Sequence, residues 1–247
     1  MAGSGIFVWL VGVPLSMLMR RKPEDYGYAP DGESPTTGVA QKHGVVAVVE
    51  PDFTLKQALK SPKFWYLSMA HSISLMAWGA VSVHAIPALV DGGLSEQTAS
   101  TMAGVMLGFA VFGRLFAGFT ADWLGTKRIL AVAFAMQTVG LVFLSSVTNF
   151  GMAVFFAVFM GIGYGARGTL LVSYRGELFG KRAFAAITGI SELILAVGYV
   201  ASPLLAGLAY DAQKSYFWAF IGLAILNAIG MLFLVPIRAS ANARWST

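Results

Sequence analysis

Residues 115–128 read LFAGFTADWLGTKR, and they join two long apolar stretches of the chain. Gly118, Asp122 and Gly125 come first, and the basic pair Lys127–Arg128 follows directly. Glycine permits a tight turn and a close approach between helices. An aspartate can accept hydrogen bonds from an arginine or from the N-terminus of a neighbouring helix. The stretch therefore predicts a short basic turn between two helices, with a carboxylate available to a neighbouring element.

The composition around this turn is that of a membrane protein. Hydrophobic residues make up 57% of the 247 residues and charged residues only 12%, whereas about a quarter of a soluble domain is charged. These proportions exclude a disordered chain, a disulfide scaffold and an ordinary soluble enzyme. His43, His71 and His84 do not have the spacing of a zinc site, and no nucleophile elbow or phosphate loop occurs. We expect no enzyme activity, no cofactor and no metal.

Seven stretches approach the roughly 20 apolar residues that a membrane-spanning helix needs. They are 6–19, 62–90, 98–121, 129–147, 150–174, 183–210 and 216–237. The first is short by itself, so we expect its helix to occupy residues 1–19. It is not a signal peptide, because basic residues follow it rather than precede it. The other six form a domain over 62–237, and residues 238–247 form a tail.

The segment 20–61 separates the first span from the others. It contains four prolines among glycines, serines and charged residues, which predicts an irregular loop. Its last part, 53–60, has apolar residues at helical spacing and two lysines, so we expect a short helix on the membrane surface. Ser61 followed by Pro62 is typical of an N-cap and the first position of a helix.

The positions of lysine and arginine predict the orientation, because these residues gather in cytoplasmic loops. If 20–61 is cytoplasmic, fourteen of the 17 basic residues, Arg175 among them, fall in cytoplasmic segments. Lys214 alone falls on the other side, and Arg114 and Arg167 lie within spans. The net charge of +5 therefore indicates orientation in the cell membrane, with the long loop and the C-terminus cytoplasmic. It requires no nucleic-acid partner.

Two segments of the chain repeat one pattern. Residues 115–122 and 204–211 both read L-x-A-G-x-x-x-D, and each ends the second span of a group of three. By the charge distribution, Asp122 is cytoplasmic and Asp211 lies on the opposite side. A repeat of opposite orientation is typical of inverted-topology transporters.

Glycines recur in three of the spans and predict close contacts between helices. They are Gly104, Gly108, Gly113 and Gly118 in one span, Gly161, Gly163, Gly165 and Gly168 in another, and Gly189, Gly198 and Gly207 in a third.

The turn at 118–128 resembles the signature that follows the second helix of each half of major facilitator superfamily transporters. Further segments resemble the monocarboxylate and oxalate–formate antiporter-like branch of that superfamily. They are RRKPEDYG (20–27), TLKQAL (54–59), HAIP (84–87), D-x-GLS (91–95) and ELFGKR (177–182). The resemblance implies an all-α polytopic bundle, namely the sixth helix, the central cytoplasmic loop and the six-helix C-terminal half of that fold. It also implies that Gly118, Asp122, Gly125, Lys127 and Arg128 form a motif that acts in conformational change.

Three charged residues and one histidine lie at membrane depth. Counted from the cytoplasmic ends of their spans, Arg114, Arg167, Glu192 and His71 all lie roughly 12–13 Å deep. Charged groups at this depth usually face a cavity or a partner, and arginine offers a bidentate fork to a carboxylate. We therefore predict a site in which Arg114, Arg167 and His71 bind a small carboxylate. Glu192 is the candidate for proton coupling.

Each of these residues also has a structural alternative. Arg114 and Glu192 could form an ion pair that locks two helices, Arg167 could extend to lipid headgroups, and His71 could be a hydrogen-bonded packing residue. The resemblance adds that Arg114 falls where the oxalate–formate antiporter carries a functional arginine. The functional lysine of its helix eleven has no counterpart, and Glu192 occupies that helix. Two arginines and one glutamate leave a net charge of +1, which suits a monocarboxylate.

We therefore expect a secondary transporter of small organic anions such as monocarboxylates, with protons as the candidate coupling ion. It would work in a lipid bilayer by alternating access. The resemblance covers only part of the family fold, so a missing N-terminal half or a second copy of the chain would complete the molecule. Two alternatives stay open: a non-transporting membrane protein built on half a transporter, and an inactive truncated product.

Overall fold

A computed structural model describes Pro14 and residues 53–237. Over 53–237 the chain forms helices and no strand. The helices are α2 (Leu55–Lys60), α3 (Pro62–Asp91), α4 (Glu96–Leu124), α5 (Thr126–Ser145), α6 (Phe150–Phe179), α7 (Phe184–Gln213) and α8 (Phe217–Leu232). The predicted helix at 1–19 (apart from Pro14), the loop before residue 53 and the tail 238–247 lie outside the described residues.

The predicted all-helical membrane bundle is confirmed. The helices α3 to α7 are 20–30 residues long and apolar enough to cross a membrane, and α8 is a shorter apolar helix. The short helix α2 is present as well. Its capping box joins the Thr54 side chain to the backbone N–H of Gln57, while the Gln57 side chain accepts from the Thr54 backbone N–H. Pro62 then begins α3 after Ser61, as expected.

The last span is shorter than the predicted range 216–237. Its α-helix ends at Leu232, and the chain continues through bonds between residues three apart. Leu234 donates to the carbonyl of Met231 at 3.0 Å, and Ile237 donates to that of Leu234 at 3.2 Å. Pro236 has no N–H to donate and disfavours helical geometry in the residue before it. The α-helix therefore cannot continue through this segment.

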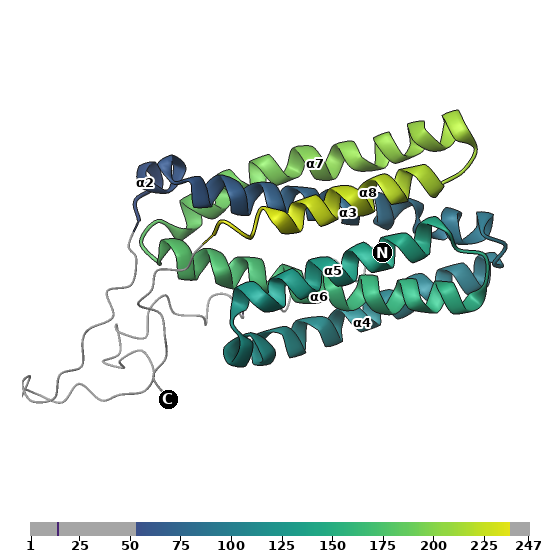
Figure 1. Cartoon of the computed structure of the whole chain (residues 1–247), viewed down its shortest axis with the longest axis horizontal. Helices are drawn as coiled ribbons and strands as arrows, with labels where there is room; N and C mark the ends of the chain where they lie inside the picture. Colours follow the sequence, from purple (N-terminus) through teal and green to yellow (C-terminus); the bar gives the residue numbers. More distant parts are fainter. Residues whose placement is uncertain (1–13, 15–52, 238–247) are drawn as a thin grey trace, which may run out of the picture. The chain divides into compact units, whose positions relative to one another are not determined.

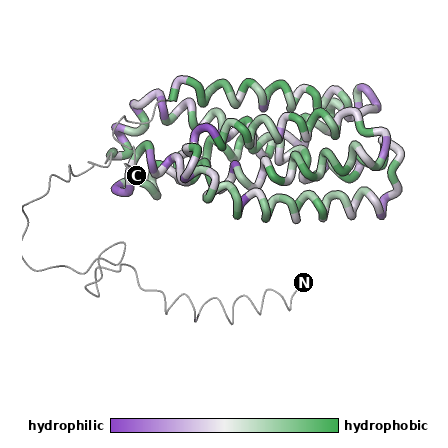
Figure 2. The backbone as a smooth tube through the Cα atoms, turned by 60° about the horizontal axis from the view of Figure 1, so that its bottom comes forward, coloured by the Kyte–Doolittle hydropathy of each residue, from purple (hydrophilic) through white to green (hydrophobic). Residues whose placement is uncertain are grey.

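The turns between the helices gather at two ends of the bundle (Figure 1). The helix α2, the α4–α5 turn and the α6–α7 turn lie at one end, here called the α2 end. The α3–α4, α5–α6 and α7–α8 turns lie at the opposite end. Hydrophilic residues concentrate at both ends and the lengths between them are mainly hydrophobic (Figure 2). This distribution is the one expected of helices whose middle parts lie in hydrocarbon.

In chain order, the six helices after α2 form two groups of three, α3 to α5 and α6 to α8, and most of the packing is between the groups. The second helix of each group packs mainly on the first helix of the other group, so that α4 packs on α6 and α7 on α3. The third helix of the first group, α5, packs mainly on α6 and also on α8, and α8 packs mainly on α5. The α4–α6 and α7–α3 pairs exchange partners as two repeats related by a twofold axis would.

Glycines let α4 approach α6 until backbones touch. The α-carbons of Gly161 and Gly165 face the carbonyl oxygens of Met106 and Ala110, and a Cβ at either glycine would overlap them. The predicted close contacts are thus confirmed for these two residues. They are also confirmed for Gly113, Gly163 and Gly198, and Gly207 lies in ordinary contact range of His84. For Gly104, Gly108, Gly118, Gly168 and Gly189 a Cβ would meet no atom of the described residues within 4 Å, so the prediction is not confirmed at these positions.

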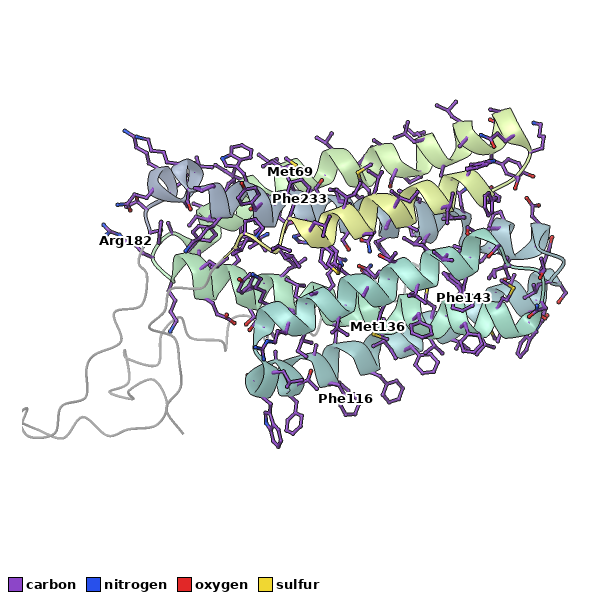
Figure 3. All side chains as sticks on the ribbon, in the orientation of Figure 1. Met69, Phe116, Met136, Phe143, Arg182 and Phe233 are labelled. Carbon is purple, nitrogen blue, oxygen red and sulfur yellow. The ribbon has the colours of Figure 1, made fainter. Side chains whose placement is uncertain are left out.

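The outer faces of α4 and α7 carry large apolar side chains that no described residue covers. On α4, Phe116 points away from the bundle (Figure 3) and is 61% exposed. On α7, Leu193 and Val197 are 71% and 72% exposed. In α6, by contrast, 56% of the most apolar window is buried, against 17% in α7. The α6 helix is therefore the one whose side chains lie inside the bundle.

Candidate functional site

Two arginines of α6 are buried in the bundle. Arg167 is 2% exposed and Arg175 is 1% exposed. The sequence predicts Arg175 in the cytoplasmic segment after the span 150–174, whereas in the structure it lies within α6, which runs on to Phe179. Gly180 ends the helix with a φ of 75°, a conformation that glycine adopts readily. That glycine is the signal in the sequence that could have extended the predicted helix to include Arg175.

Arg175 lies between α3 and α7. Its Nη2 is 3.4 Å from Nδ1 of His71, and its Nη1 is 3.8 Å from Oε1 of Glu192. A guanidinium has only donors, so Nδ1 of His71 must accept, which requires an imidazole whose hydrogen is on Nε2. The Nη1 group is buried and has no hydrogen-bond partner. Arg175 is thus held by one long hydrogen bond and one loose ion pair.

Arg167 is still less well partnered. Its Nε and Nη1 are buried without a hydrogen-bond partner. Its guanidinium carbon lies 5.3 Å from the centre of the Tyr164 ring, within the range of a cation–π contact. Glu192 and Arg114 both act on it electrostatically. A buried cation in this condition lacks the hydrogen bonds that normally accompany burial.

The structure brings three of the four residues predicted to share one level, His71, Arg167 and Glu192, together with Arg175. The fourth, Arg114, acts on Arg167 electrostatically. We call these five residues the arginine cluster. His71 is 8% exposed, whereas Arg114 is exposed on α4. The carboxylate of Glu192, on a side chain that is 54% exposed, pairs with Arg175. The alternative ion pair between Arg114 and Glu192 is therefore not the one that forms. Arg167 is too deeply buried to extend to headgroups, so that alternative is wrong.

The motif residues lie at the α2 end, around the α4–α5 turn. Gly125 has a φ of 88° and stands between the two helices, so glycine is required for this turn. The ammonium group of Lys127 donates to the carbonyl oxygens of Val235 and Ile237, both at 2.8 Å. Lys127 thereby holds the segment after α8 against the start of α5. Asp122 and Arg128 are exposed.

One contact at this end was missed by the sequence analysis. Thr126 donates from its hydroxyl to a carboxylate oxygen of Glu177. The bond joins the first residue of α5 to the last turn of α6. It therefore ties the turn at 118–128 to the helix that carries the two buried arginines.

A second polar region lies between α3, α5 and α8 and contains no charge; we call it the neutral network. The hydroxyl of Ser74 donates to the side-chain oxygen of Gln137. The amide nitrogen of Asn227 donates to the carbonyl of Phe134 at 2.9 Å and to the hydroxyl of Thr138 at 3.0 Å. Ser74, Gln137 and Asn227 are all 0% exposed. These bonds join three helices through neutral groups.

His84 joins three elements at the opposite end of the bundle. Its Nε2 is 2.9 Å from the carbonyl oxygen of Pro203, so this nitrogen carries a hydrogen. Its Nδ1 is 3.1 Å from the hydroxyl of Tyr216. Burial, together with the negative charges of Asp91 and Asp211, raises the pKa of the Tyr216 hydroxyl. The phenol therefore keeps its proton and can donate it to His84.

The described part of the chain offers neither a metal site nor a polar cavity at the arginines. No three His, Cys, Asp or Glu side chains there gather as metal ligands would. An apolar cavity of about 170 Å³ lies between α3, α7 and α8, with Met76, Ser202 and Leu223 in its wall. None of the arginines lines this cavity, so the buried charges identify the candidate site and the cavity does not.

Comparison with known proteins supplies the family. The family model described as Major Facilitator Superfamily matches residues 67–244, which is more than half of the chain. The chain belongs to the major facilitator superfamily. Together with the apolar helices of 20–30 residues, this makes it a multi-pass membrane protein of a transporter family.

Several curated members of this superfamily are similar in sequence. Monocarboxylate transporter 4 of Mus musculus is 28% identical over 180 residues, which cover 69% of this chain and 38% of that protein. Monocarboxylate transporter 7 of Homo sapiens is 25% identical over 191 residues, covering 76% and 36%. A putative metabolite transport protein, YwtG, of Bacillus subtilis is 27% identical over 146 residues, covering 58% and 32%. This major facilitator chain therefore spans less than two-fifths of the length of these relatives.

Proposed function

We propose that the chain is the C-terminal half of a secondary transporter that moves small monocarboxylates by alternating access. One observation carries the proposal: Arg167 is 2% exposed, and its Nε and Nη1 have no hydrogen-bond partner. An unpaired charge in a low-dielectric environment costs several kcal/mol. An anion that binds Arg167 would offset that cost, so the unpartnered donors favour an anionic ligand.

The arrangement of charges favours an anion with a single carboxylate. Arg175 has Glu192 beside it, so Arg167 is the buried arginine without a matching acid. A carboxylate fits the fork of a guanidinium with two parallel hydrogen bonds. Arg114, which is exposed on α4 and acts on Arg167 electrostatically, would contact the same anion with its own guanidinium fork. The names of the similar monocarboxylate transporters support the same substrate class.

Glu192 offers a way to couple this anion to a proton. When the carboxyl is ionised, it competes with a substrate for Arg175, from which it lies 3.8 Å. When the carboxyl is protonated, the ion pair is lost and Arg175 becomes available to the anion. Proton binding and anion binding would then favour each other, as reciprocal linkage requires.

The exposed faces of α4 and α7 would meet the other half of the transporter. Both faces carry large apolar side chains, and the similar relatives are much longer than this chain. In this arrangement the α2 end faces the cytoplasm, because Lys127, Arg128, Lys181 and Arg182 all lie there and basic residues gather on that side. Asp122, exposed at the same end, would be available to a helix N-terminus of the other half.

The test is uptake of radiolabelled L-lactate by proteoliposomes that contain the complete protein. Arg114→Ala and Arg114→Lys should both lower uptake at least about tenfold, because a point charge does not replace the bidentate fork. Lys60→Ala, which removes an exposed positive charge from α2, serves as the control and should change uptake less than twofold. Unchanged kinetics in both Arg114 variants would remove Arg114 from the substrate path.

A further inference from the structure

Two aromatic rings stand next to the most poorly partnered arginine. The rings of Trp78 on α3 and Tyr164 on α6 are stacked, with centroids 3.7 Å apart and planes 11° from parallel. The guanidinium of Arg167 lies over the Tyr164 ring at 5.3 Å. Both aromatic residues are half-buried. A flat apolar surface therefore borders the unpartnered donors of Arg167.

Along the helices, aromatic side chains lie on one side of Arg167 and charged side chains lie on the other. On α3, His71 and Trp78 are two turns apart and share a face. On α6, Tyr164 and Arg167 are one turn apart, and Arg175 follows about two turns later. The rings therefore lie toward the opposite end of the bundle, while Arg175, His71 and Glu192 lie toward the α2 end. A ligand whose carboxylate binds Arg167 has the aromatic pair on one side of it and charged groups on the other.

We propose that the site selects monocarboxylates with a flat, apolar body, that is, aromatic acids. The carboxylate binds Arg167 and the ring of the acid lies against Trp78 and the edge of Tyr164, because Trp78 stacks on the Tyr164 ring and Arg167 lies over it. This inference rests on the proposed function and names the body of the anion that the proposed function leaves open. Aromatic rings attract one another beyond the burial of their area. A small hydroxy acid or a short dicarboxylate gains nothing from such a surface.

The two rings could instead serve only to hold Arg167 in position. The two roles make different predictions. If the rings only position the arginine, their removal weakens the binding of every carboxylate to the same extent. If the rings contact the ligand, their removal weakens the binding of a flat aromatic acid and leaves the binding of a short aliphatic acid almost unchanged.

The experiment is isothermal titration calorimetry on the complete protein in lipid nanodiscs, with benzoate, cyclohexanecarboxylate and propionate as probes. Cyclohexanecarboxylate is as apolar as benzoate but not flat, and propionate has almost no body. We expect benzoate to bind about tenfold more tightly than propionate and several-fold more tightly than cyclohexanecarboxylate. Trp78→Leu should raise the Kd for benzoate about three- to tenfold and change the Kd for propionate less than twofold.

Two further variants guard against misfolding and non-specific effects. Trp78→Phe keeps a ring at this position and should retain most of the preference for benzoate, even if the leucine variant is unstable. Trp218→Leu removes a tryptophan that is 60% exposed on α8 and should leave all three affinities unchanged.

The outcomes separate the two proposals. Equal losses for benzoate and propionate in Trp78→Leu, or no preference for benzoate in the unmodified protein, would overturn the aromatic specificity and leave carboxylate binding intact. If none of the three acids binds, or if Arg167→Ala leaves their binding unchanged, the proposed function fails and the specificity fails with it.

Discussion

The arginine cluster and the neutral network are two polar regions of one bundle, and they differ in how many of their buried donors and acceptors have hydrogen-bond partners. In the neutral network, Ser74, Gln137 and Asn227 each make a hydrogen bond to another helix, and only Gln137 Nε2 and Asn227 Oδ1 lack a partner. In the arginine cluster, the buried groups without a partner belong to the cations Arg167 and Arg175.

The two regions differ in the free-energy cost of burying a polar group without a hydrogen-bond partner. A buried neutral donor or acceptor without a partner costs about 1–3 kcal/mol, which a helical bundle can tolerate. An unpaired buried charge costs several kcal/mol, so the arginine cluster is the region where a ligand would change the energy most. The neutral network joins helices, and the arginine cluster is the proposed site for an anion. Four experiments test this contrast.

The largest effect should follow from separating the helices that enclose the arginines. In Gly165→Ala the new Cβ would overlap the carbonyl oxygen of Ala110, and α4 would have to move away from α6. Overpacking of this kind costs about 3 kcal/mol or more when backbone must shift. We expect little folded protein by size-exclusion chromatography in detergent. Gly168→Ala, on the same helix with no atom within 4 Å of its Cβ, is the matched control and should fold normally.

The next effect should separate function from stability at the arginine cluster. Arg167→Ala removes a buried cation whose donors lack partners, so we expect uptake of labelled monocarboxylate to fall about 100-fold. The melting temperature should stay the same or rise, because no existing hydrogen bond is lost. A large fall in melting temperature together with normal uptake would mean that Arg167 is a structural residue. The arginine cluster would then stabilise the fold, as the neutral network is expected to do.

The opposite pattern is expected in the neutral network. Asn227→Leu leaves Thr138 and the Phe134 carbonyl without the donor they now share. The loss should destabilise the protein by about 1–3 kcal/mol, which corresponds to a decrease of several °C in melting temperature. The KM for uptake should change less than twofold. If the Asn227→Leu variant has normal stability and impaired uptake, the neutral network lies in the transport path.

The smallest effect concerns the acid of the arginine cluster. Glu192→Gln removes the charge that lies 3.8 Å from Arg175, and the substituted amide cannot titrate. We expect uptake driven by a proton gradient to be lost and its pH dependence to flatten, whereas exchange of labelled for unlabelled substrate continues within about threefold. Uptake with an unaltered pH profile would exclude Glu192 from proton coupling.

Some of these features could be read from the sequence alone. The membrane-spanning helices follow from long apolar runs, because each backbone polar group must be satisfied within its own helix in hydrocarbon. The turn at Gly125 and the start of α3 at Pro62 follow from local backbone rules. The placement of Arg167, Glu192 and His71 in one region follows from counting depth along each helix, since the rise per residue is constant.

Other features were decided only by the tertiary structure. Sequence spacing sets the depth of a residue along its helix but not the direction in which its side chain meets other helices. The pairing of Glu192 with Arg175 rather than Arg114 depends on how far α6 extends and on which helices enclose it. The stack of Trp78 on Tyr164 joins residues of two helices far apart in the chain. Glycines that look alike in the sequence differ for the same reason: Gly165 touches α4 and Gly168 touches nothing, because only one of them faces the neighbouring helix.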